Sequence, residues 1–137
     1  MLYFAYGANL SRGAMRASAP SSEPAGRARL AGWRFVIAAS GWASIVPDPA
    51  AAVEGLLWRV DSADIERLDV FEGVGEGLYG KEIVRVTSGT REIEAWVYVE
   101  TKGGTGRPRP GYLEAILDAA RDLGLAPEYI EALARWR

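Results

Sequence analysis

Glycines that interrupt strand-like runs are the feature that most limits how this chain can fold. Two runs are dense in apolar, aromatic and β-branched residues, 28–39 and 53–60, and each carries an interior glycine, Gly32 or Gly55. A glycine inside a strand often marks a bulge or a sharp bend, so both strands are expected to curve. A strongly curved antiparallel sheet tends to close on itself. The pattern therefore predicts a small β-barrel.

The remaining predicted elements place most strands before the last helices. Four more strands are expected from apolar and alternating runs, at 2–6, 43–46, 79–88 and 92–100, the last two as a hairpin. Pro47 and Pro49 are expected to end the strand at 43–46. Helices are expected at 11–18, 61–73, 113–123 and from Pro127 onward. This order indicates an α+β fold, in one domain over residues 1–137, rather than a parallel doubly wound sheet.

Two residue types are missing from the chain, and their absence limits its chemistry. The sequence contains no histidine and no cysteine. Serine–histidine triads, cysteine nucleophiles, imidazole acid–base catalysis and the usual zinc sites are therefore excluded. If the protein is an enzyme, proton transfer must fall to Asp, Glu, Lys or Tyr.

Charge and hydropathy limit the partners. The formal net charge is -2 with both signs interspersed, which argues against a nucleic-acid partner. No apolar run has the length needed to span a bilayer, and the N-terminus lacks the pattern of a secretory signal. We therefore expect no membrane partner and a cytoplasmic location.

The N-terminal run ends in a turn that suits anion binding. Residues 2–6 have the length of a strand, and Gly7 and Asn9 then permit a tight turn. A strand end followed by such a turn leaves several backbone N–H groups unpaired and pointing the same way. Such groups bind a carboxylate or a developing oxyanion. The alternative is that these residues form only a first strand that ends in a turn without a binding role.

Glu72 is the carboxylate that the helical pattern singles out. On a helical wheel it falls between Ile65 and Leu68, inside the apolar stripe that also includes Phe71. Removing a carboxylate from water raises its pKa towards the range in which it can accept and return a proton. The alternative is that the helix has already ended by Phe71 and Glu72 only caps a loop.

Other conspicuous residues have ordinary explanations beside functional ones. Gly73, Gly75 and Gly77 lack the spacing of a phosphate-binding loop, and the segment 102–111 is expected to be an exposed, mobile loop. Tyr79 and Tyr112 each lie near a predicted loop and could reach a site or pack in the core. Three tryptophans could serve an interface or fill the core: Trp33, Trp42 and Trp136.

Three short motifs follow one another in an order that is typical of one enzyme family. They are Tyr6-Gly7-Ala8-Asn9-Leu10 after a strand, Phe71-Glu72-Gly73-Val74 after a helix, and Gly77-Leu78-Tyr79 at the start of the next strand. With the C-terminal stretches 108–112 and 123–129, they make the chain resemble the γ-glutamylcyclotransferase family over nearly its whole length. The chain departs from that family in one place, because Ala8 stands where serine is usual.

The resemblance implies a fold, a reaction and a set of site residues. It implies a small β-barrel, antiparallel or mixed, with peripheral helices and a cavity at one barrel mouth. The implied reaction turns a γ-glutamyl amino acid or peptide into 5-oxoproline by attack of its own α-amine. Glu72 matches the catalytic glutamate, and Tyr79 and Tyr112 match tyrosines that line the cavity. The loop that cradles the glutamyl group corresponds to Tyr6, Gly7, Ala8, Asn9 and Leu10.

The resemblance also implies what the reaction requires. It needs a small-molecule γ-glutamyl substrate and no metal or cofactor, in a protein expected to be a monomer or a homodimer. Two alternatives stay open at this point. One is a γ-glutamylamine cyclotransferase, and the other is a non-catalytic module that binds a small carboxylate. The leaving group is not disclosed by these residues.

Overall fold

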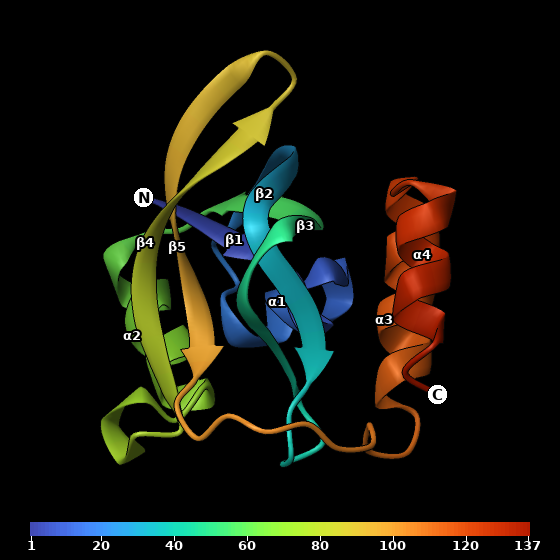
Figure 1. The fold of residues 1–137 in the computed structure, drawn as a ribbon. Coiled ribbons are helices and arrows are strands. Elements are labelled where there is room, and N and C mark those ends of the chain that lie inside the picture. The colour runs from blue at the N-terminus through green and yellow to red at the C-terminus, as the bar shows by residue number, and fades with distance from the viewer.

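Five strands close into a barrel in the computed structural model, which describes residues 1–137 (Figure 1). The strands are β1 Leu2–Ala5, β2 Glu23–Ile37, β3 Ala43–Arg59, β4 Tyr79–Ser88 and β5 Arg91–Glu100. Their order around the barrel is β1-β3-β2-β4-β5. Neighbouring strands are antiparallel except β1 and β5, which pair in parallel through Tyr3 and Trp96. The predicted α+β fold with a small mixed barrel is confirmed.

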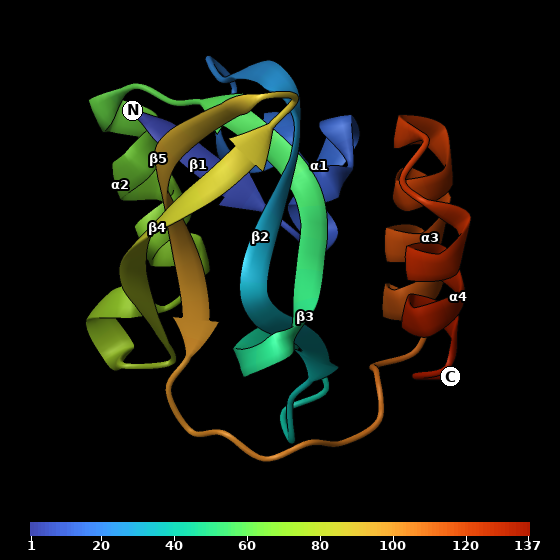
Figure 2. The same cartoon turned by 45° about the horizontal axis from the view of Figure 1, so that its top comes forward.

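Helices surround the barrel on more than one side. They are α1 Arg12–Ser18, α2 Ser62–Phe71, α3 Tyr112–Leu123 and α4 Pro127–Ala134, with short 3₁₀ helices at Ala8–Leu10 (η1) and Val74–Glu76 (η2). In both views α3 and α4 lie side by side on one side of the barrel, and α2 lies on the other (Figures 1 and 2). None of these helices combines the length and apolarity needed to cross a bilayer.

Local sequence signals account for where the helices begin. The Ser11 hydroxyl accepts a hydrogen bond from Ala14 N at 3.3 Å, and the Asp61 carboxylate accepts one from Asp64 N at 2.9 Å. Each satisfies a backbone donor that the first helical turn leaves free. Pro127 occupies the first turn of α4, where its missing N–H costs nothing.

Glycines bend the long β2–β3 hairpin as the pattern predicts. The register between these strands shifts between Ala31 and Trp33, around Gly32, whose φ of +85° favours glycine. Gly55 serves a different purpose, because a Cβ there would collide with the Ala5 carbonyl oxygen and crowd the Phe4 ring. Gly55 thus lets the end of β1 approach β3 closely, just beyond the four residues of β3 with which β1 pairs.

The predicted end of a strand at the prolines is wrong. Strand β3 continues from Ala43 to Arg59 through Pro47 and Pro49, so the two strands expected at 43–46 and 53–60 are one. Strand β1 pairs only with the stretch from Leu56 to Arg59. The proline-bearing half of β3 thus has β2 on one edge and no strand on the other, and an open edge tolerates residues without an N–H.

Helix α2 also differs from its prediction. It ends at Phe71 rather than Gly73, and Phe71 is 74% exposed, so the expected apolar stripe contains Leu68 but not Phe71. Phe71 instead lies at the cavity, whose lining includes it. Of the three tryptophans left open, Trp33 and Trp136 pack against the core, and Trp42 is exposed.

Candidate active site

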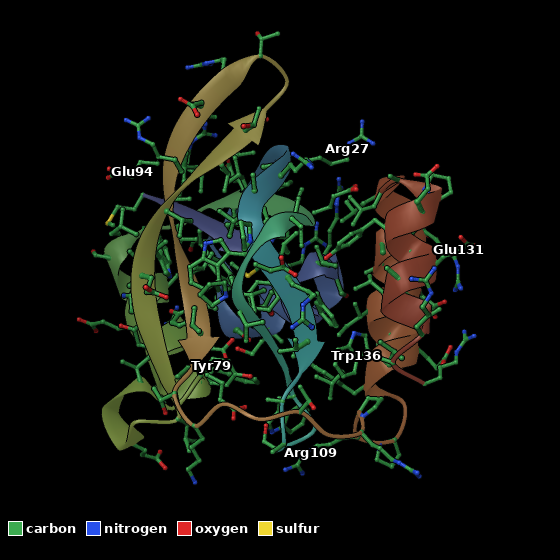
Figure 3. The ribbon with its side chains drawn as sticks, viewed as in Figure 1. Arg27, Tyr79, Glu94, Arg109, Glu131 and Trp136 are labelled. Carbon is green, nitrogen blue, oxygen red and sulfur yellow. The ribbon has the colours of Figure 1, made fainter.

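A cavity of about 410 Å³ opens at one end of the barrel, and 17 residues line it. The segment between β5 and α3 crosses this end, where Figure 3 shows Tyr79 and Arg109. Seven of the eight residues suggested by the sequence are among the lining residues: Tyr6, Gly7, Ala8, Asn9, Glu72, Tyr79 and Tyr112. The eighth, Leu10, is not, because it is only 1% exposed and belongs to the hydrophobic core.

The turn after β1 borders this cavity, and three of its backbone amides have no partner among the turn, loop and cap hydrogen bonds. Within it, Leu10 N donates to Gly7 O at 3.0 Å and Ser11 N donates to Ala8 O at 3.1 Å. The amides of Gly7, Ala8 and Asn9 take part in none of the turn, loop or cap hydrogen bonds. Unpaired donors are expected at the start of a helical turn, and here they lie beside a cavity.

Space at Gly7 is limited. A Cβ on Gly7 would lie 3.3 Å from the Ala43 side chain and 3.4 Å from the Tyr112 hydroxyl. A Cβ would be tight against Ala43 and in van der Waals contact with the Tyr112 hydroxyl, so a side chain larger than that of alanine would crowd both. Glycine keeps the amides and that hydroxyl close together.

Buried partners hold Asn9 in position. The side-chain amide of Asn9 donates to the Tyr3 hydroxyl at 3.1 Å, and the backbone carbonyl oxygen of Asn9 accepts a hydrogen bond from Trp58 Nε1 at 2.9 Å. Tyr3, Asn9 and Trp58 are all buried. Tyr3 also lines the cavity, although sequence reasoning missed it. Every residue from Tyr3 to Tyr6 is buried, so no alternation marks which of them faces the site.

Glu72 reaches the cavity from the end of α2. It is the C-terminal cap residue, with its N–H donating to Leu68 O at 2.9 Å, and Gly73 then turns the chain with a φ of +66°. The alternative in which the helix ends by Phe71 is therefore right about the helix end. The carboxylate nevertheless lines the cavity, where it makes no hydrogen bond or ion pair. Loss of water around it raises the pKa of Glu72 to about 7.

The backbone of one residue, Ala43, bonds the two tyrosine hydroxyls in opposite senses. The Tyr79 hydroxyl donates to Ala43 O at 2.6 Å, while Ala43 N donates to the Tyr112 hydroxyl oxygen at 3.1 Å. A phenol has one proton to donate. The Tyr79 hydroxyl already donates its proton to Ala43 O, whereas the Tyr112 hydroxyl only accepts, so its proton is free to bond a ligand. Burial raises the pKa of Tyr112 to about 12, so this proton is present at neutral pH.

The mouth of the cavity contains residues that the sequence did not point to. They are Ser40, Trp42, Phe71, Leu78, Glu100, Lys102 and Arg109. The loop 101–111 is mostly exposed, as expected, but it is tied to the β2–β3 turn. Gly106 N donates to Ile37 O at 3.0 Å and Arg109 N donates to Gly41 O at 3.2 Å. Only these tertiary contacts bring Arg109 to the mouth, and no spacing in the sequence signals them.

Fold and cavity together define a class, namely small mixed barrels that accept a small molecule at one barrel mouth. The model of the AIG2-like family matches residues 52–133. γ-Glutamylcyclotransferases of Mus musculus and Homo sapiens are each 32% identical over an alignment of 143 positions, gaps included, that covers 96% of this chain and 76% of each relative. A solved γ-glutamyl cyclotransferase structure superposes with a TM-score of 0.92 at 30% identity, over 98% of this chain and 86% of that one. The chain belongs to the γ-glutamylcyclotransferase family and is an enzyme of that family.

Proposed function

We propose that the protein converts a γ-glutamyl amino acid or peptide into 5-oxoproline and a free amino acid or peptide. One observation carries the proposal. Glu72, a carboxylate without a partner, lines the same cavity as the free amides of Gly7, Ala8 and Asn9. The cavity volume of about 410 Å³ suits a small dipeptide.

Glu72 serves as the general base and then as the general acid. The substrate's α-ammonium gives a proton to the Glu72 carboxylate, and the resulting amine attacks the γ-carbonyl carbon of the same molecule. A carbon–nitrogen bond forms and closes the five-membered ring. The bond to the leaving nitrogen then breaks as Glu72 returns the proton to that nitrogen. The regenerated Glu72 carboxylate takes the second proton from the ring nitrogen, which leaves the neutral lactam, and the released amine finally takes up that proton as an ammonium. A pKa of about 7 suits both transfers at neutral pH.

Fixed donors stabilise the charge that develops on the carbonyl oxygen. The amides of the turn and the free proton of Tyr112 are the candidates, because all of them border the cavity. Amine and carbonyl belong to one molecule, so a bent pose of the substrate supplies much of the rate advantage. A backbone amide can donate a hydrogen bond whichever side chain its residue has. Ala8 in place of the family's serine is therefore compatible with this role.

The test is the release of 5-oxoproline from γ-glutamylalanine. We expect wild-type protein to form it and the Glu72→Gln variant to lose about 10²- to 10⁴-fold in kcat, the usual contribution of one acid–base group. Glu76→Gln is the matched control, because Glu76, the last residue of η2, is exposed and does not line the cavity. A folded Glu72→Gln protein that works at the wild-type rate contradicts the proposal.

A further inference from the structure

Arg109 is held firmly at the mouth of the cavity. Its guanidinium carbon lies 4.4 Å from the centre of the Trp42 ring, and its Nε donates to Ser40 O at 3.1 Å. Room for its stem depends on Gly41, because a Cβ there would lie 2.8 Å from Arg109 Cγ. Stacking on an aromatic face and a bond from Nε both limit where the guanidinium can point.

The two terminal nitrogens of Arg109 remain free. They donate no hydrogen bond and take part in no ion pair, and the same is true of the nearby Lys102 ammonium. A guanidinium whose stem and Nε are fixed presents a planar fork of donors that matches a carboxylate. One acidic group shares this mouth, Glu100, and the Ser40 hydroxyl donates to its carboxylate at 2.7 Å.

A continuous row of contacts leads from Arg109 to the reacting end of the cavity. The Trp42 ring packs edge-on against Tyr112 with 4.9 Å between ring centres, and the Tyr112 hydroxyl accepts a hydrogen bond from Ala43 N. The inner end is closed by the buried side chains of Tyr3 and Asn9. A γ-glutamyl group at the inner end therefore directs the rest of its substrate outward, past Trp42 towards Arg109.

We propose that Arg109 binds the carboxylate of the leaving group, so that the enzyme selects γ-glutamyl compounds that release an amino acid or peptide rather than a simple amine. This inference rests on the proposed cyclisation and adds the residue that recognises the released half. Two free cations at the mouth favour an anionic leaving group. Glu100 would favour a cationic one, but it is a single carboxylate beside the two cations Lys102 and Arg109.

The experiment compares two substrates that differ only in the charge of the leaving group, γ-glutamylalanine and γ-glutamylalaninamide. For wild-type protein we expect kcat/KM to be about 10-fold higher for the acid, mainly through KM, as befits one charge-assisted hydrogen-bonded pair. In Arg109→Gln the preference should fall several-fold, because only the acid loses its partner and Lys102 alone is left to favour it. Arg107→Gln is the matched control: Arg107 lies in the same loop, is exposed and does not line the cavity.

The outcomes separate this inference from the function on which it rests. Equal kcat/KM for acid and amide in the wild type overturns the role of Arg109 while the cyclisation stands. If γ-glutamylamines turn over faster than γ-glutamylalanine, and Glu100→Gln removes that advantage, the role of Arg109 is overturned and the site prefers a cationic leaving group. If no γ-glutamyl compound yields 5-oxoproline, the proposed function itself fails.

Discussion

The inner end and the mouth of the cavity are built in different ways. At the inner end, Asn9 is fixed through buried hydrogen bonds to Tyr3 and Trp58. At the mouth, Trp42 is 39% exposed, and Arg109 is exposed and held by stacking and one side-chain hydrogen bond. Buried bonds fix positions closely, while exposed contacts contribute little energy. We infer that the inner end governs the chemistry and that the mouth governs which substrate enters.

After the loss of Glu72 itself, the largest effect should come from Asn9→Ala at the inner end. The change removes a donor from the buried Tyr3 hydroxyl, at a cost of about 1–3 kcal/mol in the free energy of unfolding. It also loosens the turn, and misplacement by about 1 Å can lower kcat about 10²-fold. Urea unfolding and kcat measure both effects. Ser40→Ala is the comparison at the mouth. Equal losses of kcat and of the free energy of unfolding in the two variants would contradict the proposed difference between the inner end and the mouth.

A smaller effect distinguishes the two tyrosines. Tyr112→Phe removes the free proton and should lower kcat about 10²-fold, as the loss of one oxyanion donor does. Tyr79→Phe leaves Ala43 O without its partner and should lower the free energy of unfolding by about 1 kcal/mol, with a weaker effect on kcat. Steady-state kinetics and unfolding of both variants provide the measurement. The assignment is wrong if Tyr79→Phe has the lower kcat.

Stability should depend on pH through Glu72. Its pKa rises from 4.5 to about 7 in the folded protein, so the folded state holds this proton more tightly than the unfolded state does. The contribution of Glu72 is therefore most favourable below pH 4.5 and is lost as the pH rises to about 7. Unfolding curves across this window should show less loss with rising pH in Glu72→Gln than in the wild type. Parallel curves for the two proteins would mean that Glu72 has an ordinary pKa.

The smallest expected effect is that of Lys102→Gln at the mouth. An exposed charge contributes about 0.2–1 kcal/mol, so KM for γ-glutamylalanine should rise about 1.5- to 5-fold with kcat unchanged. Added salt should reduce the difference between the variant and the wild type, because it screens exposed charges. A fall in kcat would place Lys102 with the groups of the inner end.

Local patterns predicted much of the barrel. Gly32 indicated the bulge in β2, the two runs at 79–88 and 92–100 the β4–β5 hairpin, and Pro127 the start of α4. The break at Pro47 was predicted wrongly, because the open edge that tolerates it depends on where β1 pairs. Local patterns therefore fail to predict where a strand ends when the pairing of its neighbours determines it.

The site shows the same limit. The helical pattern pointed to Glu72 but placed it inside α2. The helix in fact ends at Phe71, and Glu72 lines the cavity as the C-terminal cap residue. Tyr3 gave no signal in a strand with no alternation. Trp42 and Arg109 meet only because a distant loop crosses the barrel end.

The dependence of kcat/KM on pH tests the role of Glu72 most directly. The unprotonated carboxylate is the form that accepts the substrate's proton, so activity on γ-glutamylalanine should fall about 10-fold per pH unit below about 7, the pKa of Glu72. An acid limb near pH 7 that disappears in the residual activity of Glu72→Gln is the predicted result. An acid limb near pH 4.5, or one that persists in that variant, would contradict the account.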